Sequence, residues 1–131
     1  MFKWNDNGQP KTQYRFREKN NVNGLADGSY YAEIVYEEVR NGYEYLTVDM
    51  LKVAGYACSD NIIFESTGEG YTMEVAAGCV ISDSSVFTET GLTKKYYDSI
   101  GPIIDQYGFG TKISFEVSDG KITNIDKFYI A

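Results

Sequence analysis

The stretch that decides the fold is residues 90–130, TGLTKKYYDSIGPIIDQYGFGTKISFEVSDGKITNIDKFYI. Its second half alternates apolar and polar residues, as a half-buried strand does, with Ile113, Phe115 and Val117 on one face. Asp119-Gly120 suits the positive dihedral angles of a two-residue hairpin turn, and Ile122–Ile130 returns as the next strand. The chain is therefore expected to close with a β-hairpin.

A helix is predicted before this hairpin. Between Leu92 and Tyr107 apolar residues recur at the three- and four-residue steps of one helix face. Thr90 or Thr93 is available as the N-cap, and Gly108 is suited to a left-handed stop. Gly101-Pro102 interrupts the pattern, because proline cannot donate a backbone hydrogen bond, so we expect a kink or two short helices there.

The preceding sequence favours strands. Asn41-Gly42 is a strong hairpin signal between two β-rich runs, Tyr30–Val39 and Tyr43–Val53. Both faces of the second run are partly apolar, which indicates a bulge or a strand shared between core and rim. A short strand is expected at residues 62–64, a turn at 67–70, and a long alternating strand at 71–81 that places Ala77 and Cys79 with the core residues.

Together these elements predict a single mainly β domain with one α-helix (α+β). Residues 1–28 form a basic N-terminal arm, and residues 29–131 form a small antiparallel barrel with the helix between its third and fourth main strands. This order resembles an OB-type barrel from about Ser29 onward. The run TKISFEVSDGKITNI, residues 111–125, resembles the last hairpin of small OB-like domains from bacterial surface proteins and lipoproteins. The resemblance is one of pattern and carries no functional residues with it.

Charge is distributed unevenly along the 131 residues. The formal net charge is −7, but residues 1–20 hold five basic and two acidic residues, whereas the remainder holds seven basic and 17 acidic residues. An acidic body repels phosphate backbones, so direct nucleic-acid binding over a broad face is disfavoured. The acidic part of the chain after residue 20 would suit a basic protein partner. An acidic surface more commonly serves only to keep a protein soluble.

The residue types needed for common catalytic and metal sites are scarce. The chain has no histidine, which removes the usual general base and the usual zinc ligand, and no phosphate-binding glycine loop or calcium loop is present. We therefore expect no enzyme, no metal and no cofactor. Asp49 interrupts an alternating strand and is expected at an edge or rim, and Asp83 is expected in a solvated turn.

Four carboxylates cluster around the first predicted hairpin, and they are the expected contacts for a basic partner: Glu33, Glu37, Glu38 and Glu44. The first hypothesis is thus a non-enzymatic protein-binding module, with an acidic inhibitor or decoy of a nucleic-acid-binding protein as one version, as in phage-encoded acidic inhibitors. The alternative is a nucleotide- or sugar-binding domain that uses aromatic stacking by Tyr43, Tyr45 and Tyr71. An OB-like surface or lipoprotein domain of unknown role is the remaining interpretation.

The start of the sequence contains no apolar core of a signal peptide and no membrane-spanning run. On that basis the expected compartment is the cytoplasm, where Cys58 and Cys79 would be reduced thiols. An exported parent protein would instead allow the two cysteines to pair.

Overall fold

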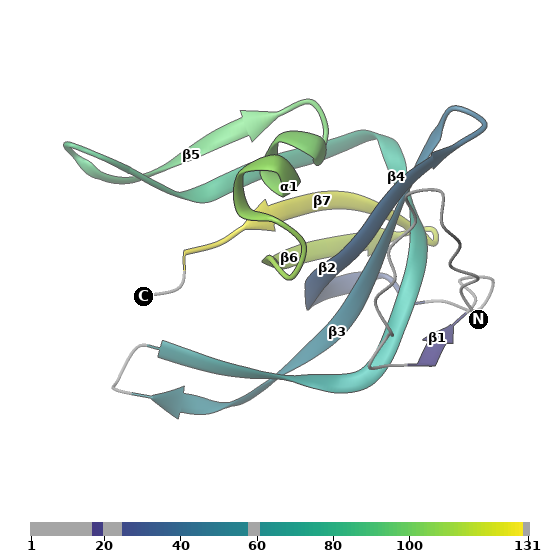
Figure 1. Ribbon diagram of the computed structural model, residues 1–131, viewed down its shortest axis with the longest axis horizontal. Helices are drawn as coiled ribbons and strands as arrows, with labels where there is room; N and C mark the ends of the chain where they lie inside the picture. The colour runs from purple at the N-terminus through teal and green to yellow at the C-terminus, as the bar shows by residue number, and fades with distance from the viewer. Residues whose placement is uncertain (1–16, 20–24, 58–60, 130–131) are drawn as a thin grey trace.

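The computed structural model describes residues 17–19, 25–57 and 61–129, and this part of the chain is mostly β with a single short helix (Figure 1). The elements in chain order are β1 Arg17–Lys19, β2 Gly28–Arg40, β3 Tyr43–Ala57, β4 Asn61–Thr88, β5 Gly91–Tyr97, α1 Gly101–Tyr107, β6 Lys112–Ser118 and β7 Lys121–Lys127. Most of the predicted basic arm, residues 1–28, lies outside the described residues.

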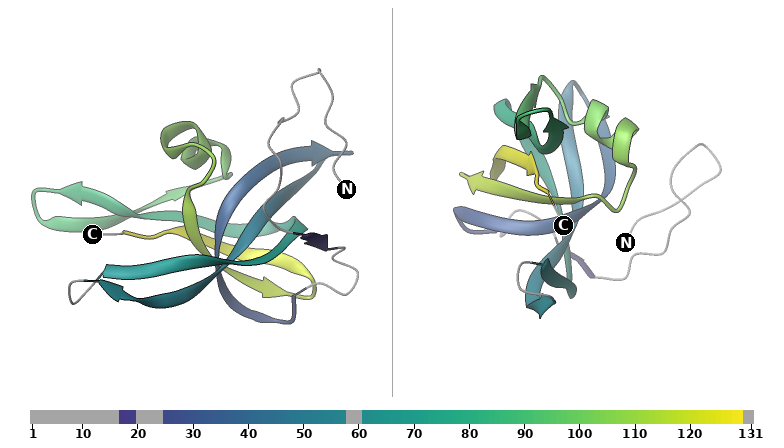
Figure 2. Two further views of the ribbon diagram at one scale, coloured as in Figure 1. Left: turned by 60° about the horizontal axis from the view of Figure 1, so that its bottom comes forward. Right: turned by 90° about the vertical axis from the view of Figure 1, so that its left-hand side faces the viewer.

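Five of the strands form a closed barrel, as Figures 1 and 2 show. They are hydrogen-bonded in the order β4-β3-β2-β6-β7, and a parallel pairing between β4 and β7 closes the ring. The other neighbouring pairs in the ring are antiparallel. The prediction of a mainly β chain that forms a small barrel is therefore confirmed. Outside the ring, β1 runs parallel to β4 and β5 pairs with β4.

Both predicted hairpin turns are confirmed. Asn41 and Gly42 have φ values of 53° and 82°, and Asp119 and Gly120 have φ values of 54° and 76°. These left-handed conformations match the right-handed twist of the flanking strands, and asparagine, aspartate and glycine adopt them at low cost. The local sequence was therefore sufficient to specify β2–β3 and β6–β7.

The predicted long helix is wrong in its first half. Residues 91–97 form β5, and α1 begins only at Gly101, with Ile100 as an N-cap that makes no side-chain hydrogen bond. Pro102 sits in the first turn of the helix, where a missing N–H costs nothing. The β-prone residues before it pair with β4 instead, so cross-strand pairing outweighs the apolar periodicity. Gly108 ends the helix as predicted, with a φ of 83°.

Strand β4 differs from the expected short strand at 62–64, turn at 67–70 and long alternating strand at 71–81. It is continuous over 28 residues and passes through Gly68, which has a φ of 83°. Its pairing with β7 shifts register between Val75 and Val80. Near this shift Ala77 is exposed, so the prediction that it lies in the core is wrong, whereas Cys79 is half-buried and packs against the core.

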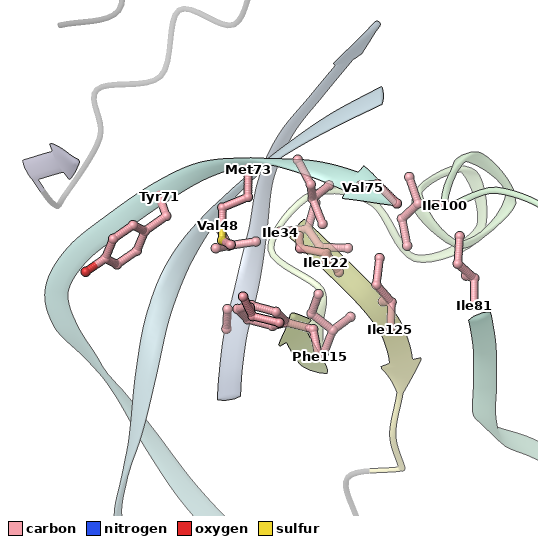
Figure 3. Close-up of a cluster of buried hydrophobic side chains, with 14 of the residues drawn as sticks. Ile34, Val48, Tyr71, Met73, Val75, Ile81, Ile100, Phe115, Ile122 and Ile125 are labelled. Atoms are coloured by element: carbon pink, nitrogen blue, oxygen red, sulfur yellow. The ribbon is translucent and has the colours of Figure 1, made fainter. Parts of the chain in front are cut away.

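The core fills the barrel interior, as the close-up in Figure 3 shows. Its fully buried members come from every barrel strand and from α1: Phe115, Ile34, Leu46, Met73, Ile103, Ile122 and Ile125 among others. In β3 all six residues from Leu46 to Leu51 are buried. The pairing of β3 with β4 shifts register twice, between Asp49 and Leu51 and between Val53 and Gly55, which bears out the predicted bulge.

Candidate binding site at the barrel mouth

A pocket of about 300 Å³ lies at the end of the barrel beside the β2–β3 turn. The lining residues come from this hairpin, from the irregular middle of β4, from the segment after β5 and from the start of β7: Gly42, Tyr43, Glu44, Glu74, Val75, Ala76, Ala77, Cys79, Ile81, Asp98 and Lys121. Segments far apart in the sequence thus meet at one site. A barrel mouth is a common place for ligands to bind.

The described residues that line the pocket include one basic side chain and three acidic side chains. The ammonium of Lys121 lies 3.4 Å from Glu74 Oε2 and is half exposed. Glu44 and Asp98 are the other two acids. The lining is therefore acidic overall and suits a positively charged group.

The side chain of Glu44 lies close to that of Glu37. Val39 is paired with Glu44 and Glu37 with Leu46, so the two carboxylates are diagonal neighbours on one face of the hairpin. Burial raises the pKa of Glu44 to about 7, and a hydrogen bond and charge repulsion from Glu37 add to the effect. Near neutral pH the pair therefore holds a proton that an incoming cation could replace.

The other two predicted carboxylates already have cationic partners. Glu33 Oε2 lies 3.3 Å from Lys112 Nζ on the adjacent strand β6. Glu38 pairs with Arg40, whose Nε lies 3.0 Å from Glu38 Oε2. Of the four predicted acids, the structure thus brings Glu37 and Glu44 together at the mouth and places the other two in ion pairs.

The three predicted tyrosines lie in different environments. Tyr43 lines the pocket and is 58% exposed, so its ring is open to a ligand. Tyr45 is half-buried beneath the guanidinium of Arg40, 4.6 Å from the ring centroid. Tyr71 belongs to the core and has a relative exposure of 8%, which leaves little of its ring for stacking. A three-tyrosine stacking surface is therefore not assembled in the described structure.

The sequence reasoning did not identify Glu74, Asp98, Lys121 or Cys79 as site residues. They reach the pocket because the irregular part of β4, the segment after β5 and the β6–β7 hairpin meet the first hairpin there. Burial, with a contribution from the charge of Glu44, raises the pKa of Cys79 to about 12. A thiol with this pKa is almost wholly protonated at neutral pH and is a poor nucleophile.

Two aspartates differ from their predicted positions. Asp49 is fully buried opposite Glu33, where it accepts a 2.7 Å hydrogen bond from Ser66, so the predicted edge or rim position is wrong. Asp83 is also fully buried within β4 and accepts hydrogen bonds from Ser85 and Tyr107, so it is not in a solvated turn. Within the described ranges, no three side chains of the metal-binding types are grouped as a metal site would require.

The raised pKa of Glu44 leads to a stability prediction. In the unfolded chain its pKa is near 4.5, so folding favours the protonated form and the folded state loses stability as pH rises from about 4.5 to about 7. Glu44→Gln should remove this loss and stabilise the protein by about 1 kcal/mol at about pH 8, a value reduced for partial exposure. The gain should vanish at about pH 4.

Urea denaturation of both proteins at the two pH values measures this difference. Glu116→Gln, at an exposed position on β6, is the matched control and should show little change. An equal Glu44→Gln effect at both pH values would contradict the shared-proton interpretation.

Comparison of the chain with protein-family models, with curated proteins and with solved structures gave no match. In the described part of the chain, no helix has the length and apolar character needed to cross a membrane.

Proposed function

We propose that the chain is a non-enzymatic binding module of OB type whose barrel mouth receives a basic side chain from a protein partner. The OB-type assignment is supported by the connectivity: three consecutive antiparallel strands, a helix before the closing hairpin, and a parallel pairing of the third and last barrel strands. OB barrels bind ligands on and around the loop between their first two strands, and here Asn41-Gly42 forms that loop.

The observation that carries the proposal is the Glu37–Glu44 pair at the edge of an acidic pocket. Two carboxylates held close together repel each other once both are ionised, and a lysine or arginine side chain would relieve this repulsion. The volume of about 300 Å³ suits one such side chain better than a polymer.

Two observations favour binding over catalysis. The sequence has no histidine, and the thiol that lines the pocket has its pKa raised to about 12. No activated nucleophile is thus found among the described lining residues, and Glu44, whose pKa is raised to about 7, is the lining group suited to proton transfer. A partner whose basic surface normally binds nucleic acid would fit the same site, which is the decoy version of the proposal.

A fluorescently labelled peptide of alternating arginine and glycine provides a direct test. Its affinity should fall about tenfold in the double variant Glu37→Gln/Glu44→Gln, because the two carboxylates that face the cation are lost. The affinity for the wild-type protein should also rise as pH increases through about 7, where Glu44 loses its proton. Fluorescence anisotropy at about 150 mM salt measures both effects.

The double variant Glu65→Gln/Glu116→Gln is the matched control, since it removes the same two charges from exposed positions away from the mouth. Its affinity should stay within about twofold of wild type. Equal losses of affinity in the two double variants would mean that peptide binding depends only on the net charge of the protein, and the proposed site would be wrong. In a second assay, a basic protein captured from lysate through the mouth should be released by single-stranded nucleic acid if the decoy version holds.

A small-ligand function is the second candidate, favoured by the exposed ring of Tyr43 on the pocket wall. The acids there disfavour nucleotide phosphates, so a sugar is the better match. Quenching of tyrosine fluorescence by a sugar, lost in Tyr43→Ala, would favour this candidate over the peptide site.

A further inference from the structure

The end of β4 and strand β5 form a two-stranded ribbon that extends from the barrel, on the same side as the β3–β4 hairpin (Figures 1 and 2). Five consecutive β5 residues, Leu92–Tyr96, are exposed, so neither face of this strand is covered. An isolated pair of strands is marginally stable in water, and further strands or packing normally stabilise it.

The outer edge of the ribbon is open. Among the described strands, β5 pairs only with β4, so the opposite edge of β5 presents unpaired backbone donors and acceptors. Such an edge is a template for the addition of another strand.

The charge on this edge is opposite to that of the chain. Strand β5 contains Lys94 and Lys95 and no acid, whereas the chain carries a formal net charge of −7. Consecutive strand residues point to opposite faces, so one lysine lies on each face of the ribbon. Lys95 Nζ lies 5.3 Å from the centroid of the Tyr97 ring, and both lysines remain exposed.

Apolar side chains flank the lysines. Phe87 and Leu92 are directly paired across the ribbon and are 65% and 47% exposed. Tyr96 is also exposed, and the Tyr129 ring contacts Phe87 edge-on with a centroid separation of 5.3 Å. Exposed aromatic and apolar residues beside an open strand edge provide contacts for alternate side chains of an added strand.

From this charge and geometry we propose that an extended acidic segment of a partner protein adds to the outer edge of β5 as a third strand. Acidic residues in the middle of that segment would face Lys94 and Lys95 on the two faces of the ribbon. A second copy of this chain is a poor occupant, because antiparallel pairing of two β5 strands about their centres would set lysine against lysine. This site is separate from the acidic barrel mouth and has the opposite charge.

The test uses a labelled peptide, Val-Thr-Glu-Glu-Thr-Val, with blocked ends. It should bind the full chain at low salt, and Lys94→Gln/Lys95→Gln should weaken binding about tenfold. The reversal Lys94→Glu/Lys95→Glu should make the protein prefer the peptide Val-Thr-Lys-Lys-Thr-Val. Lys52→Gln/Lys112→Gln is the matched control, since it removes two partly exposed lysines outside both the ribbon and the barrel mouth and should leave affinity within about twofold.

Backbone pairing is tested separately with the acidic peptide methylated at alternate amide nitrogens, which should lose binding because strand addition needs those donors. The proposal is overturned if the acidic peptide does not bind at about 1 mM, or if its methylated form binds equally well. It is also overturned if Lys94→Gln/Lys95→Gln binds the acidic peptide as tightly as the control lysine variant does. A wild-type dimer that Thr93→Pro dissociates would also overturn it, since the edge would then belong to a second copy. Glu37→Gln/Glu44→Gln should leave peptide binding unchanged, which separates this test from that of the mouth.

Discussion

Replacing Phe115 with alanine is expected to lower the free energy of unfolding by about 3–5 kcal/mol. Phe115 lies in β6 between β2 and β7 and is 1% exposed within the core (Figure 3). Its ring packs against the Tyr30 ring at a centroid distance of 5.7 Å. The substitution removes most of a large buried side chain and leaves a cavity that the closed barrel cannot readily collapse, because strands on both sides hold β6 in place.

Chemical denaturation followed by circular dichroism measures the loss. Phe87→Ala is the matched control, since it makes the same chemical change on the exposed ribbon and should alter stability by about 1 kcal/mol or less. Similar losses in the two variants would contradict the placement of Phe115 at the centre of the core.

The second large effect is expected at Asp83. Its Oδ1 accepts the backbone N–H of Ser85 at 2.8 Å and the Ser85 hydroxyl, and its Oδ2 accepts the Tyr107 hydroxyl at 2.6 Å. Asp83→Asn keeps the shape but replaces one acceptor oxygen with a donor in a buried site. We expect a loss of about 2–3 kcal/mol, because charge-assisted hydrogen bonds are broken and a polar group is left poorly paired.

This loss should depend on pH. Burial alone would raise the pKa of Asp83, but hydrogen bonds from Ser85 and Tyr107 and the charge of Lys127 outweigh it, so the pKa is lowered. The carboxylate therefore stabilises the fold above its unfolded pKa of about 3.8, and this contribution disappears as pH falls through the lower folded pKa. The stability difference between wild type and Asp83→Asn should shrink below about pH 4.

Urea denaturation across this acidic range, with the exposed helix position Asp105→Asn as the control, measures the effect. A difference that does not change with pH would show that folding leaves the pKa of Asp83 unshifted, which would contradict stabilisation of its ionised form by these hydrogen bonds.

Local signals were sufficient where a few residues decide the backbone. Asn41-Gly42 and Asp119-Gly120 specify left-handed turn conformations, and Gly108 ends the helix with a positive φ, although its ψ of 174° is not that of a left-handed helix. The alternation of Ile113, Phe115 and Val117 likewise predicts the buried face of β6. These features depend on sterics and on side-chain period, which neighbouring residues determine.

Predictions that depended on distant residues were less successful. The apolar spacing from Leu92 to Tyr107 fits a helix, but pairing with β4 converts its first half into β5. At the barrel mouth, Glu37 and Glu44 were predictable because one hairpin holds both, whereas Glu74, Asp98 and Lys121 join them through strand pairings remote in sequence.

The sequence by itself determined a mainly β chain, its two tight hairpins, the end of the helix and the acidic character of the first hairpin. Turn dihedrals, strand alternation and charge are local properties, so composition and spacing specify them. Only the tertiary structure decided the barrel closure, the register shifts of β4, the burial of Asp49 and Asp83, and the meeting of four segments at the mouth. Each of these depends on the free energy of contacts between residues far apart in the chain, which no local pattern encodes.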